Sequence, residues 1–330
     1  MIRSGMAIGV WSLEHMHAQS YLSALTRRQD LREVRLYDST QPELVARLAA
    51  ELPLRVVSSE QELLDGLDGV IITSANASHR EMALQAAEAG VPALVEKPIA
   101  TTVEDAQTMV EAFQRAGLVL GTAFPCPFSP AFCELLSLKR AGALGDLLAI
   151  RATNRGSMPG GFFIELERSG GGAVIDHTVH VADLLRRLTG SNPTRVYAEV
   201  GHGLYHQSWD DSALLSIEMG DGSFATLDCS WSRPRSYPTW GDVNLRVIGS
   251  RTTAEVRLFD EHLTHYPWEA TPARWVSWGT DLDAAMIDDF MLAVRNGGVP
   301  RSTGEDGLWA LRVALAAYQS ARTGAPVTLD

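Results

Sequence analysis

The chain has 330 residues, of which 45% are hydrophobic and 21% are charged, and its formal net charge is -12. The acidic balance argues against a nucleic-acid partner, because phosphate binding needs a basic surface, and it disfavours anionic membranes. No apolar run approaches the roughly 20 residues of a membrane helix, and no secretory signal pattern is visible. Three cysteines in a chain of this length argue against a disulfide framework, so we expect a cytoplasmic protein.

The first 120 residues alternate between strand-like and helix-like patterns with short connections. Such alternation predicts a parallel sheet with right-handed crossovers. The predicted strands cover residues 6–11, 34–38, 55–58, 68–75, 92–98 and 118–124, and the predicted helices cover 17–29, 42–53, 60–67, 79–90 and 102–117.

After about residue 123 the pattern changes to longer, alternating strands, which indicate a largely antiparallel, open sheet with helices on one face. The other face needs a cover, and a homo-oligomer would supply it. The predicted strands cover 147–155, 195–205, 212–220, 223–233, 242–250 and 253–258. Predicted helices lie within 125–146, after a proline-rich turn, and over 170–190, 283–298 and 304–324.

These elements predict an α/β protein with two domains. Residues 1–123 form a Rossmann domain with a parallel sheet, which would bind a dinucleotide. Residues 124–330 form an α+β domain with a large, mostly antiparallel open sheet, whose uncovered face would carry the oligomer interface.

The loop after the first strand departs from the glycine-rich sequence that usually holds a dinucleotide pyrophosphate. Ser12, Glu14 and His17 stand where the three glycines are expected. The Glu14 carboxylate would repel a pyrophosphate unless it points to solvent. The loop N–H groups and the helix dipole do not depend on these side chains, so we expect them to remain available for phosphate.

An acid, Asp38, ends the second strand, where a carboxylate can accept hydrogen bonds from the ribose hydroxyls of NAD. The same carboxylate would repel the 2′-phosphate of NADP, so the sequence favours NAD. The alternative is that Asp38 is an exposed acid that starts a turn.

Two further segments offer groups for proton and oxyanion chemistry. Lys97 ends a predicted parallel strand, where an ammonium group could hydrogen-bond a substrate hydroxyl, although a lysine there is more often a solvated charge. Asp176, His180 and Asp183 share one face of the helix over 170–190, and a histidine beside a carboxylate can act as general acid or base. The alternative is a set of surface polar groups. His177 faces another way and is expected to be structural.

His15 and His17 form an H-x-H pattern after a strand, which is also how some metal-dependent hydrolases begin their ligand set, here with Asp176 and His180 as candidate partners. The chain has too few strand–helix units for the barrel that this pattern normally serves. We therefore expect no metal. Nothing near Cys126 in sequence indicates an activated thiol.

Three motifs together resemble the Gfo/Idh/MocA family over essentially the whole chain. They are EKP at the end of the fifth strand, GGGxxxDxxxHxxDLLxxLxG over residues 170–190, and the closing GEDGL…AAYQSARTGAPV. TSANASHREMALQAAEAGVPALVEKPIA also looks like the region of the family's fourth and fifth strands. The stretch AFPCPFSP lacks the asparagine and arginine that many members place beside the nicotinamide.

The resemblance implies an NAD(P)-dependent oxidoreductase that transfers a hydride between nicotinamide and a hydroxyl-bearing carbon of a sugar, sugar derivative or cyclitol. It also implies that the α+β domain over residues 124–330 binds the substrate, and that a dimer or tetramer forms through the C-terminal sheet. Lys97 would contact the nicotinamide ribose and the substrate hydroxyl, while His180 takes the hydroxyl proton and Asp176 holds the substrate. The alternative is a catalytically silent regulatory protein that senses a dinucleotide or sugar.

The residues expected to contact the cofactor, NAD rather than NADP, are Ser12, Leu13, His15, Asp38, Ser74, Asn76, His79, Glu96 and Lys97. The sequence does not identify the particular substrate or the direction of the reaction.

Overall fold

The computed structural model describes residues 5–237, 239–265, 274–277 and 279–329. The chain forms two compact units. The first comprises Met1–Pro125 and Asp281–Leu308, and the second comprises Cys126–Thr280 and Trp309–Asp330. We predicted a single domain boundary after residue 123. In the structure, residues 281–308 also belong to the first unit. The division into a cofactor domain and a substrate domain stays a prediction.

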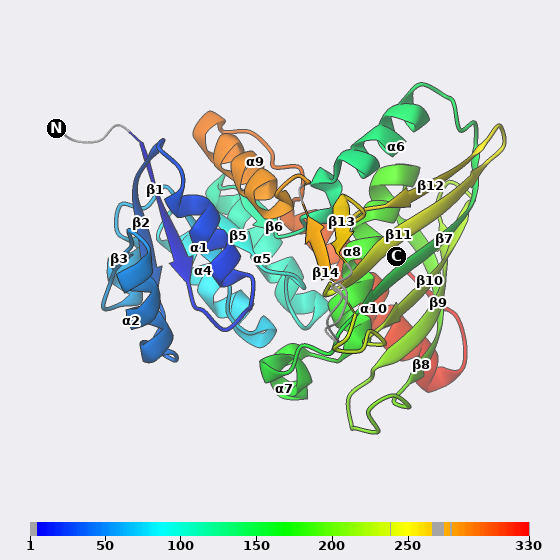
Figure 1. The fold of residues 1–330 in the computed structure, drawn as a ribbon, viewed down its shortest axis with the longest axis horizontal. Coiled ribbons are helices and arrows are strands. Elements are labelled where there is room, and N and C mark those ends of the chain that lie inside the picture. Colours follow the sequence, from blue (N-terminus) through cyan, green and yellow to red (C-terminus); the bar gives the residue numbers. More distant parts are fainter. Residues whose placement is uncertain (1–4, 238, 266–273, 278, 330) are drawn as a thin grey trace. The chain divides into compact units, whose positions relative to one another are not determined.

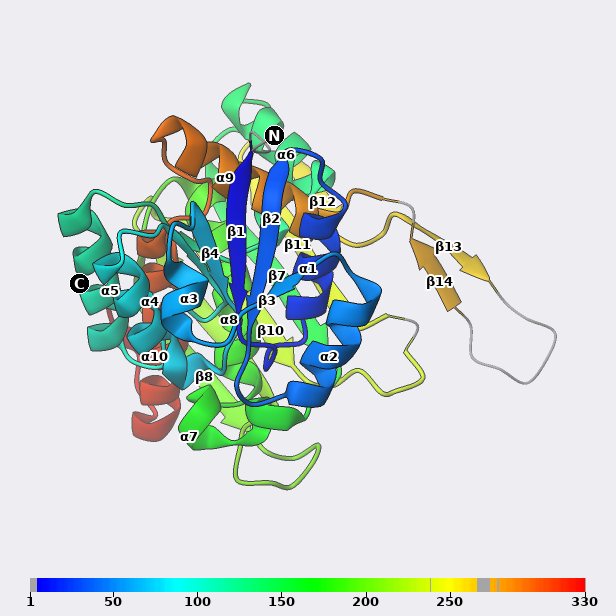
Figure 2. The same ribbon diagram turned by 90° about the vertical axis from the view of Figure 1, so that its left-hand side faces the viewer.

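The first unit is built on a parallel sheet with the strand order β3-β2-β1-β4-β5-β6, in which the described residues supply six strands (Figures 1 and 2). This is the strand order of a dinucleotide-binding fold, in which ligands bind at the carboxyl ends of the strands. The prediction of a parallel sheet is confirmed. The strands are β1 (Met6–Trp11), β2 (Leu31–Tyr37), β3 (Arg55–Val56), β4 (Gly69–Ile72), β5 (Ala93–Val95) and β6 (Leu120–Thr122).

The helices of this unit begin and end at residues suited to those positions. In α5 (Val103–Ala116), the Thr102 hydroxyl accepts the Asp105 N–H at the first turn, and Gly117 ends the helix in the left-handed region at φ 65°. Helix α1 packs beside α9, and α4 packs beside α5 (Figure 1). The other helices are α1 (Ala18–Thr26), α2 (Pro42–Glu51), α3 (Glu60–Leu64), α4 (His79–Glu88) and α9 (Leu282–Asn296).

The second unit is built on a mostly antiparallel sheet with the order β12-β11-β7-β10-β9-β8-β15. In the part of the chain that is described, β10 runs parallel to β7 and the other neighbouring pairs run antiparallel. The predicted sheet is confirmed. Its strands are β7 (Leu147–Gly156), β8 (Pro193–Gly201), β9 (Ser212–Met219), β10 (Phe224–Ser230), β11 (Gly241–Gly249), β12 (Thr253–Arg257) and β15 (Val327–Thr328).

One face of this sheet is covered by helix α8 (Ala173–Thr189), which contacts β7, β9 and β10. Side chains on β9 and β10 alternate between buried and exposed, as expected for a sheet with one covered face. A hairpin of β13 (His262–His265) and β14 (Arg274–Ser277) was not predicted. The remaining helices are α6 (Pro130–Arg140), α7 (Leu166–Ser169) and α10 (Gly304–Thr323). No helix among the described residues is long and apolar enough to cross a membrane.

The three glycines before α8 allow a close approach of chain segments at the start of this helix. A Cβ atom on Gly172 would lie 2.1 Å from the carbonyl oxygen of Asp210, and one on Gly171 would lie 2.1 Å from the Tyr318 hydroxyl oxygen. The Asp210 carboxylate accepts the N–H groups of Gly172 at 2.8 Å and Val174 at 2.7 Å, and the Tyr318 hydroxyl at 2.8 Å. Asp210 therefore caps α8 from a distant part of the sequence.

We predict that Gly172→Ala lowers the stability of the protein by about 2 kcal/mol or more, because its Cβ would force the helix away from Asp210. Denaturant unfolding measures the change. Gly203→Ala is the matched control, since a Cβ there meets nothing within 4 Å. Equal unfolding midpoints for the two variants would contradict this explanation of the glycines.

Candidate active site

The loop after β1 keeps a tight turn without glycine. Ser12 takes a positive φ of 80°, a conformation that glycine adopts more easily. The Ser12 hydroxyl donates to Asp38 Oδ2 at 3.1 Å, and its backbone N–H donates to the Tyr37 carbonyl at 2.8 Å. Side-chain hydrogen bonds to the end of β2 thus accompany a turn that a dinucleotide-binding loop normally makes with glycine.

The Asp38 carboxylate is engaged by the protein itself. Its Oδ2 atom accepts the Leu13 N–H at 2.6 Å in addition to the Ser12 hydroxyl. Its Oδ1 atom accepts the N–H groups of Thr40 and Gln41 and the Thr40 hydroxyl, at 2.6–2.9 Å. These contacts agree with the alternative in which Asp38 starts a turn, and they tie that turn to the β1 loop. A contact with ribose stays a prediction.

The sequence left open whether Glu14 points to solvent, and in the structure its Oε2 atom accepts the Ala75 N–H at 2.9 Å. Two loop N–H groups that we expected to be available for phosphate are engaged within the chain: that of His15 donates to the Thr73 carbonyl at 2.9 Å, and that of His17 donates to His15 Nδ1 at 3.2 Å. The loop therefore differs from a glycine-rich loop whose N–H groups are directed at phosphate.

The segment after β4 lies against the end of β5. Ser74, Asn76 and His79 are all buried. His79 Nδ1 lies 2.9 Å from the Pro98 carbonyl oxygen, and Nε2 lies 3.1 Å from that of Ser74. Burial lowers the pKa of His79, although Glu96 and the carbonyl oxygens beside its ring act in the opposite direction. His79 thus links the two segments expected to line the cofactor.

Lys97 follows β5 at the carboxyl edge of the parallel sheet, and its side chain is only 3% exposed. This contradicts the alternative of a solvated surface charge. Its backbone N–H donates to Glu96 Oε2 at 3.0 Å, and the peptide bond to Pro98 is cis. The lysine is held where ligands bind in folds of this kind.

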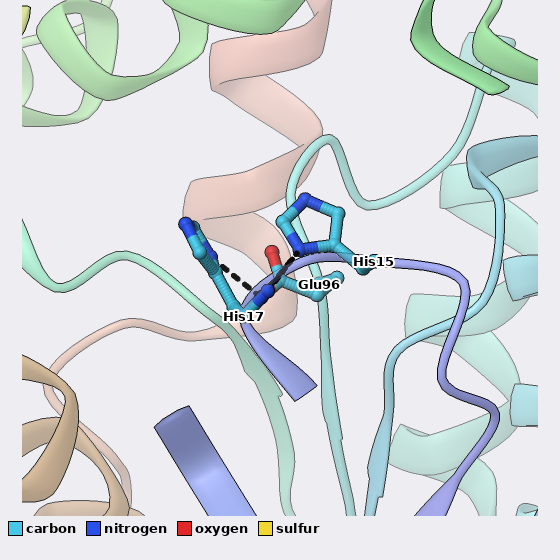
Figure 3. A group of neighbouring side chains, drawn as sticks. All are labelled: His15, His17 and Glu96. Atoms are coloured by element: carbon cyan, nitrogen blue, oxygen red, sulfur yellow. Dashed lines mark hydrogen bonds and ion pairs between the residues drawn. The ribbon is translucent and has the colours of Figure 1, made fainter. Parts of the chain in front are cut away.

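The carboxylate of Glu96 is fully buried and collects donors from two other elements. The Tyr21 hydroxyl of α1 donates to Oε1 at 2.5 Å, and His17 Nδ1 lies 3.0 Å from the same atom. His15 Nδ1 lies 3.5 Å from Oε1, so both histidines converge on Glu96 (Figure 3). The sequence indicated neither Tyr21 nor His17 as a partner of Glu96. Their four-residue spacing was the available signal, since it places both on one side of a helix.

Electrostatics in this cluster favour a charged Glu96. Burial opposes the charge, but His15, His17 and Lys97 together hold the pKa of Glu96 well below its ordinary value. Burial also opposes a charge on His17, yet Glu96 outweighs that effect and raises the pKa of His17. Burial and the neighbouring Glu96 raise the pKa of Tyr21, so its hydroxyl remains a donor.

We predict that Tyr21→Phe destabilises the protein by about 1–3 kcal/mol, because it removes a donor from a buried carboxylate. Thermal and denaturant unfolding measure the effect. Tyr197→Phe is the matched control, because Tyr197 makes the same kind of hydrogen bond to Glu199 on the surface. That variant should stay within about 0.5 kcal/mol of the original protein. Equal losses in both variants would contradict a special role for burial.

In the second unit, α8 carries the other predicted catalytic groups. Asp176 Oδ2 accepts the indole N–H of Trp231 at 3.0 Å. His177 Nε2 lies 3.2 Å from the same oxygen, while His177 Nδ1 lies 2.9 Å from the Asn154 carbonyl oxygen. The expectation that His177 faces away from Asp176 is therefore wrong. Trp231 was not indicated as a partner of Asp176, although it lies in a predicted strand of the sheet beneath α8.

His180 is buried, one turn further along α8, and its Nδ1 lies 4.0 Å from Cys126 Sγ. Asp183 forms a salt bridge with Arg187 at 2.8 Å, which supports the helix rather than a reaction. The burial of Asp176 and His180 contradicts the alternative of surface polar groups. Cys126, for which the sequence indicated no activated thiol, is therefore a neighbour of the proposed base.

Comparison with known proteins agrees with this description. Residues 8–124 match the family model described as "Oxidoreductase family, NAD-binding Rossmann fold", and residues 132–255 match "GFO/IDH/MocA C-terminal domain". The fold and these matches define an oxidoreductase with an NAD-binding Rossmann domain. The chain belongs to the Gfo/Idh/MocA family.

The chain is similar to a named reductase, a named dehydrogenase and a solved structure that contains NAD. The chain is 29% identical over 307 residues to 1,5-anhydro-D-fructose reductase of Ensifer adhaerens, covering 88% of this chain and 90% of that protein. It is 30% identical over 305 residues to scyllo-inositol 2-dehydrogenase (NAD(+)) of Bacillus subtilis, covering 86% and 85%. The crystal structure of GenD2 from gentamicin A biosynthesis in complex with NAD has a TM-score of 0.87 at 23% identity, covering 100% of this chain and 98% of GenD2. These names give no support to the regulatory alternative.

Proposed function

We propose that the protein is an NAD-dependent dehydrogenase or reductase that acts on a hydroxyl-bearing carbon of a sugar, sugar derivative or cyclitol. The buried Lys97 at the carboxyl end of β5 is the observation that carries this proposal. A desolvated ammonium at that edge of the sheet is suited to bind and polarise a ligand oxygen. The names of the two relatives support the substrate class.

Two features of the first unit support a dinucleotide: Ser12 forms the tight turn after β1, and a carboxylate, that of Asp38, follows β2 directly. When bound, NAD would supply hydride-accepting and hydride-donating chemistry. Because the N–H groups of Leu13 and His15 donate within the chain, the pyrophosphate would need other donors. The residues proposed to hold the cofactor are Ser12, Leu13, His15, Asp38, Ser74, Asn76, His79, Glu96 and Lys97.

Three side chains are proposed to act on the substrate. Lys97 hydrogen-bonds the reacting oxygen and stabilises negative charge that develops on it. His180 takes the hydroxyl proton during oxidation and returns it during reduction. Asp176, oriented by Trp231 and His177, holds the substrate.

We predict that Lys97→Met lowers kcat/KM by about 100-fold or more, because it removes the ammonium while keeping a side chain of similar length. Turnover is measured by nicotinamide absorbance with a panel of polyols and sugars, and NADH binding is followed by fluorescence. NADH binding should change by only a few-fold, which separates loss of chemistry from loss of the cofactor. Absence of turnover in the original protein across the panel, together with tight NADH binding, would support the regulatory alternative instead.

The carboxylate of Asp38 also supports a preference for NAD over NADP, because it would repel a 2′-phosphate. We predict that NADH binds at least about tenfold more tightly than NADPH, a difference of about 1.4 kcal/mol. Fluorescence titration with each reduced cofactor at the same ionic strength measures this ratio. Equal affinities would overturn the preference.

We further propose a homodimer or homotetramer that buries the open face of the second sheet. Leu214, Phe224 and Ile248 are 64%, 49% and 39% exposed on strands of this sheet, and the helix α8 covers its opposite face. A second copy of the chain would remove these side chains from water. A cytoplasmic location is also proposed, since the three cysteines form no disulfide among the residues described.

We predict that Leu214→Glu shifts the protein toward monomers, because it places a charge in the proposed contact. Size-exclusion chromatography with light scattering measures the mass. A monomeric original protein, or an unchanged mass in the variant, would count against this face as the interface.

A further inference from the structure

Three metal-ligand side chains meet in the first unit, two from the loop after β1 and one from the end of β5. One ligand-type atom from each of His15, His17 and Glu96 can be chosen so that all lie within 4.8 Å of one another (Figure 3). Glu96 Oε1 lies 3.0 Å from His17 Nδ1 and 3.5 Å from His15 Nδ1. An ion with tetrahedral bonds of about 2.0–2.1 Å holds its ligand atoms about 3.3 Å apart. The two observed distances lie on either side of that value.

The hydrogen bonds of His15 add a second, independent observation. Its Nδ1 atom accepts the backbone N–H of His17 at 3.2 Å, which requires a lone pair on that nitrogen. The same nitrogen faces the carboxylate oxygen of Glu96 at 3.5 Å, which is also an acceptor. Two acceptor atoms that face each other in this way are an arrangement that a cation bound between them would stabilise. Deprotonated imidazole and carboxylate are also the forms that bind metals.

The carboxylate is fixed by groups that would remain beside a metal ion. The Tyr21 hydroxyl donates to Glu96 Oε1 and the Lys97 N–H donates to Oε2. Partners of this kind orient metal ligands and raise affinity. His15 and Glu96 are buried, while His17 is 31% exposed and gives access from solvent.

We propose that His15, His17 and Glu96 bind one divalent first-row transition-metal ion, for which Zn²⁺ is the suitable probe. Two imidazoles and one carboxylate favour such an ion, whereas Mg²⁺ and Ca²⁺ prefer oxygen ligands. Three protein ligands leave one coordination position for solvent. The sequence suggested Asp176 and His180 as partners of the two histidines, and the absence of a barrel argued against a metal. The structure supplies Glu96 instead. His15 and Glu96 are also proposed to contact the cofactor, but metal binding to the protein without cofactor goes beyond the dehydrogenase activity and does not depend on it.

The test is metal binding to chelator-treated protein without cofactor or substrate. Isothermal titration with Zn²⁺ measures stoichiometry and affinity, and titration with Co²⁺ reports the coordination by visible absorption. We expect one ion per chain, with affinity at least about 100-fold weaker in His15→Asn and in Glu96→Gln. His206→Asn is the matched control, because His206 is an exposed histidine outside the cluster and its positive φ of 54° suits asparagine.

The substitutions at the buried residues His15 and Glu96 could prevent folding. His17→Asn is the further variant for that case, because the His17 side chain is partly exposed. We expect the same loss of Zn²⁺ affinity in this variant, with an unchanged circular dichroism spectrum. The proposal is overturned if the original protein binds less than one Zn²⁺ per chain, or if His17→Asn binds Zn²⁺ as tightly as the original protein does. Turnover measured in the presence of chelator reports separately on the dehydrogenase proposal.

Discussion

The carboxyl edge of the first sheet depends on one buried carboxylate, that of Glu96. A charge removed from water is costly unless hydrogen bonds and opposite charges surround it. Glu96 obtains them from α1, through Tyr21, from the β1 loop, through His17, and from the backbone of Lys97. The same contacts hold the proposed catalytic lysine at the end of β5. The hydrogen bonds that satisfy this buried charge therefore also fix the position of the lysine proposed to act on the substrate.

Side-chain hydrogen bonds also accompany the turn that the β1 loop makes without glycine. Glycine normally allows the tight turn and leaves backbone N–H groups for phosphate. Here the turn is kept by Ser12, and side chains of Asp38 and Glu14 accept N–H groups of the loop and of the segment after β4. The carboxylates of Asp38 and Glu14 thus accept backbone N–H groups, as a bound phosphate does in a glycine-rich loop. A cofactor bound here would meet a loop that is already internally hydrogen-bonded.

The sequence predicted the two sheets well because hydrophobic periodicity is a local signal. The strand–helix alternation before residue 123 and the longer strands after it are both present in the structure. The β13–β14 hairpin and the return of residues 281–308 to the first unit were not predicted, because long-range packing decides them. The partners of Glu96 and Asp176 were missed for the same reason. Tyr21 and Trp231 lie 75 and 55 residues away from these acids.

We propose that the Lys97 ammonium and the His180 imidazole act on the same substrate alcohol. A crystal structure of the protein with NADH and a substrate from the panel tests this pairing. We expect Lys97 Nζ and a ring nitrogen of His180 both to lie within about 3.2 Å of the reacting oxygen. A ligand bound in the proposed site with either group too far from that oxygen for a hydrogen bond, directly or through one water, would contradict the pairing.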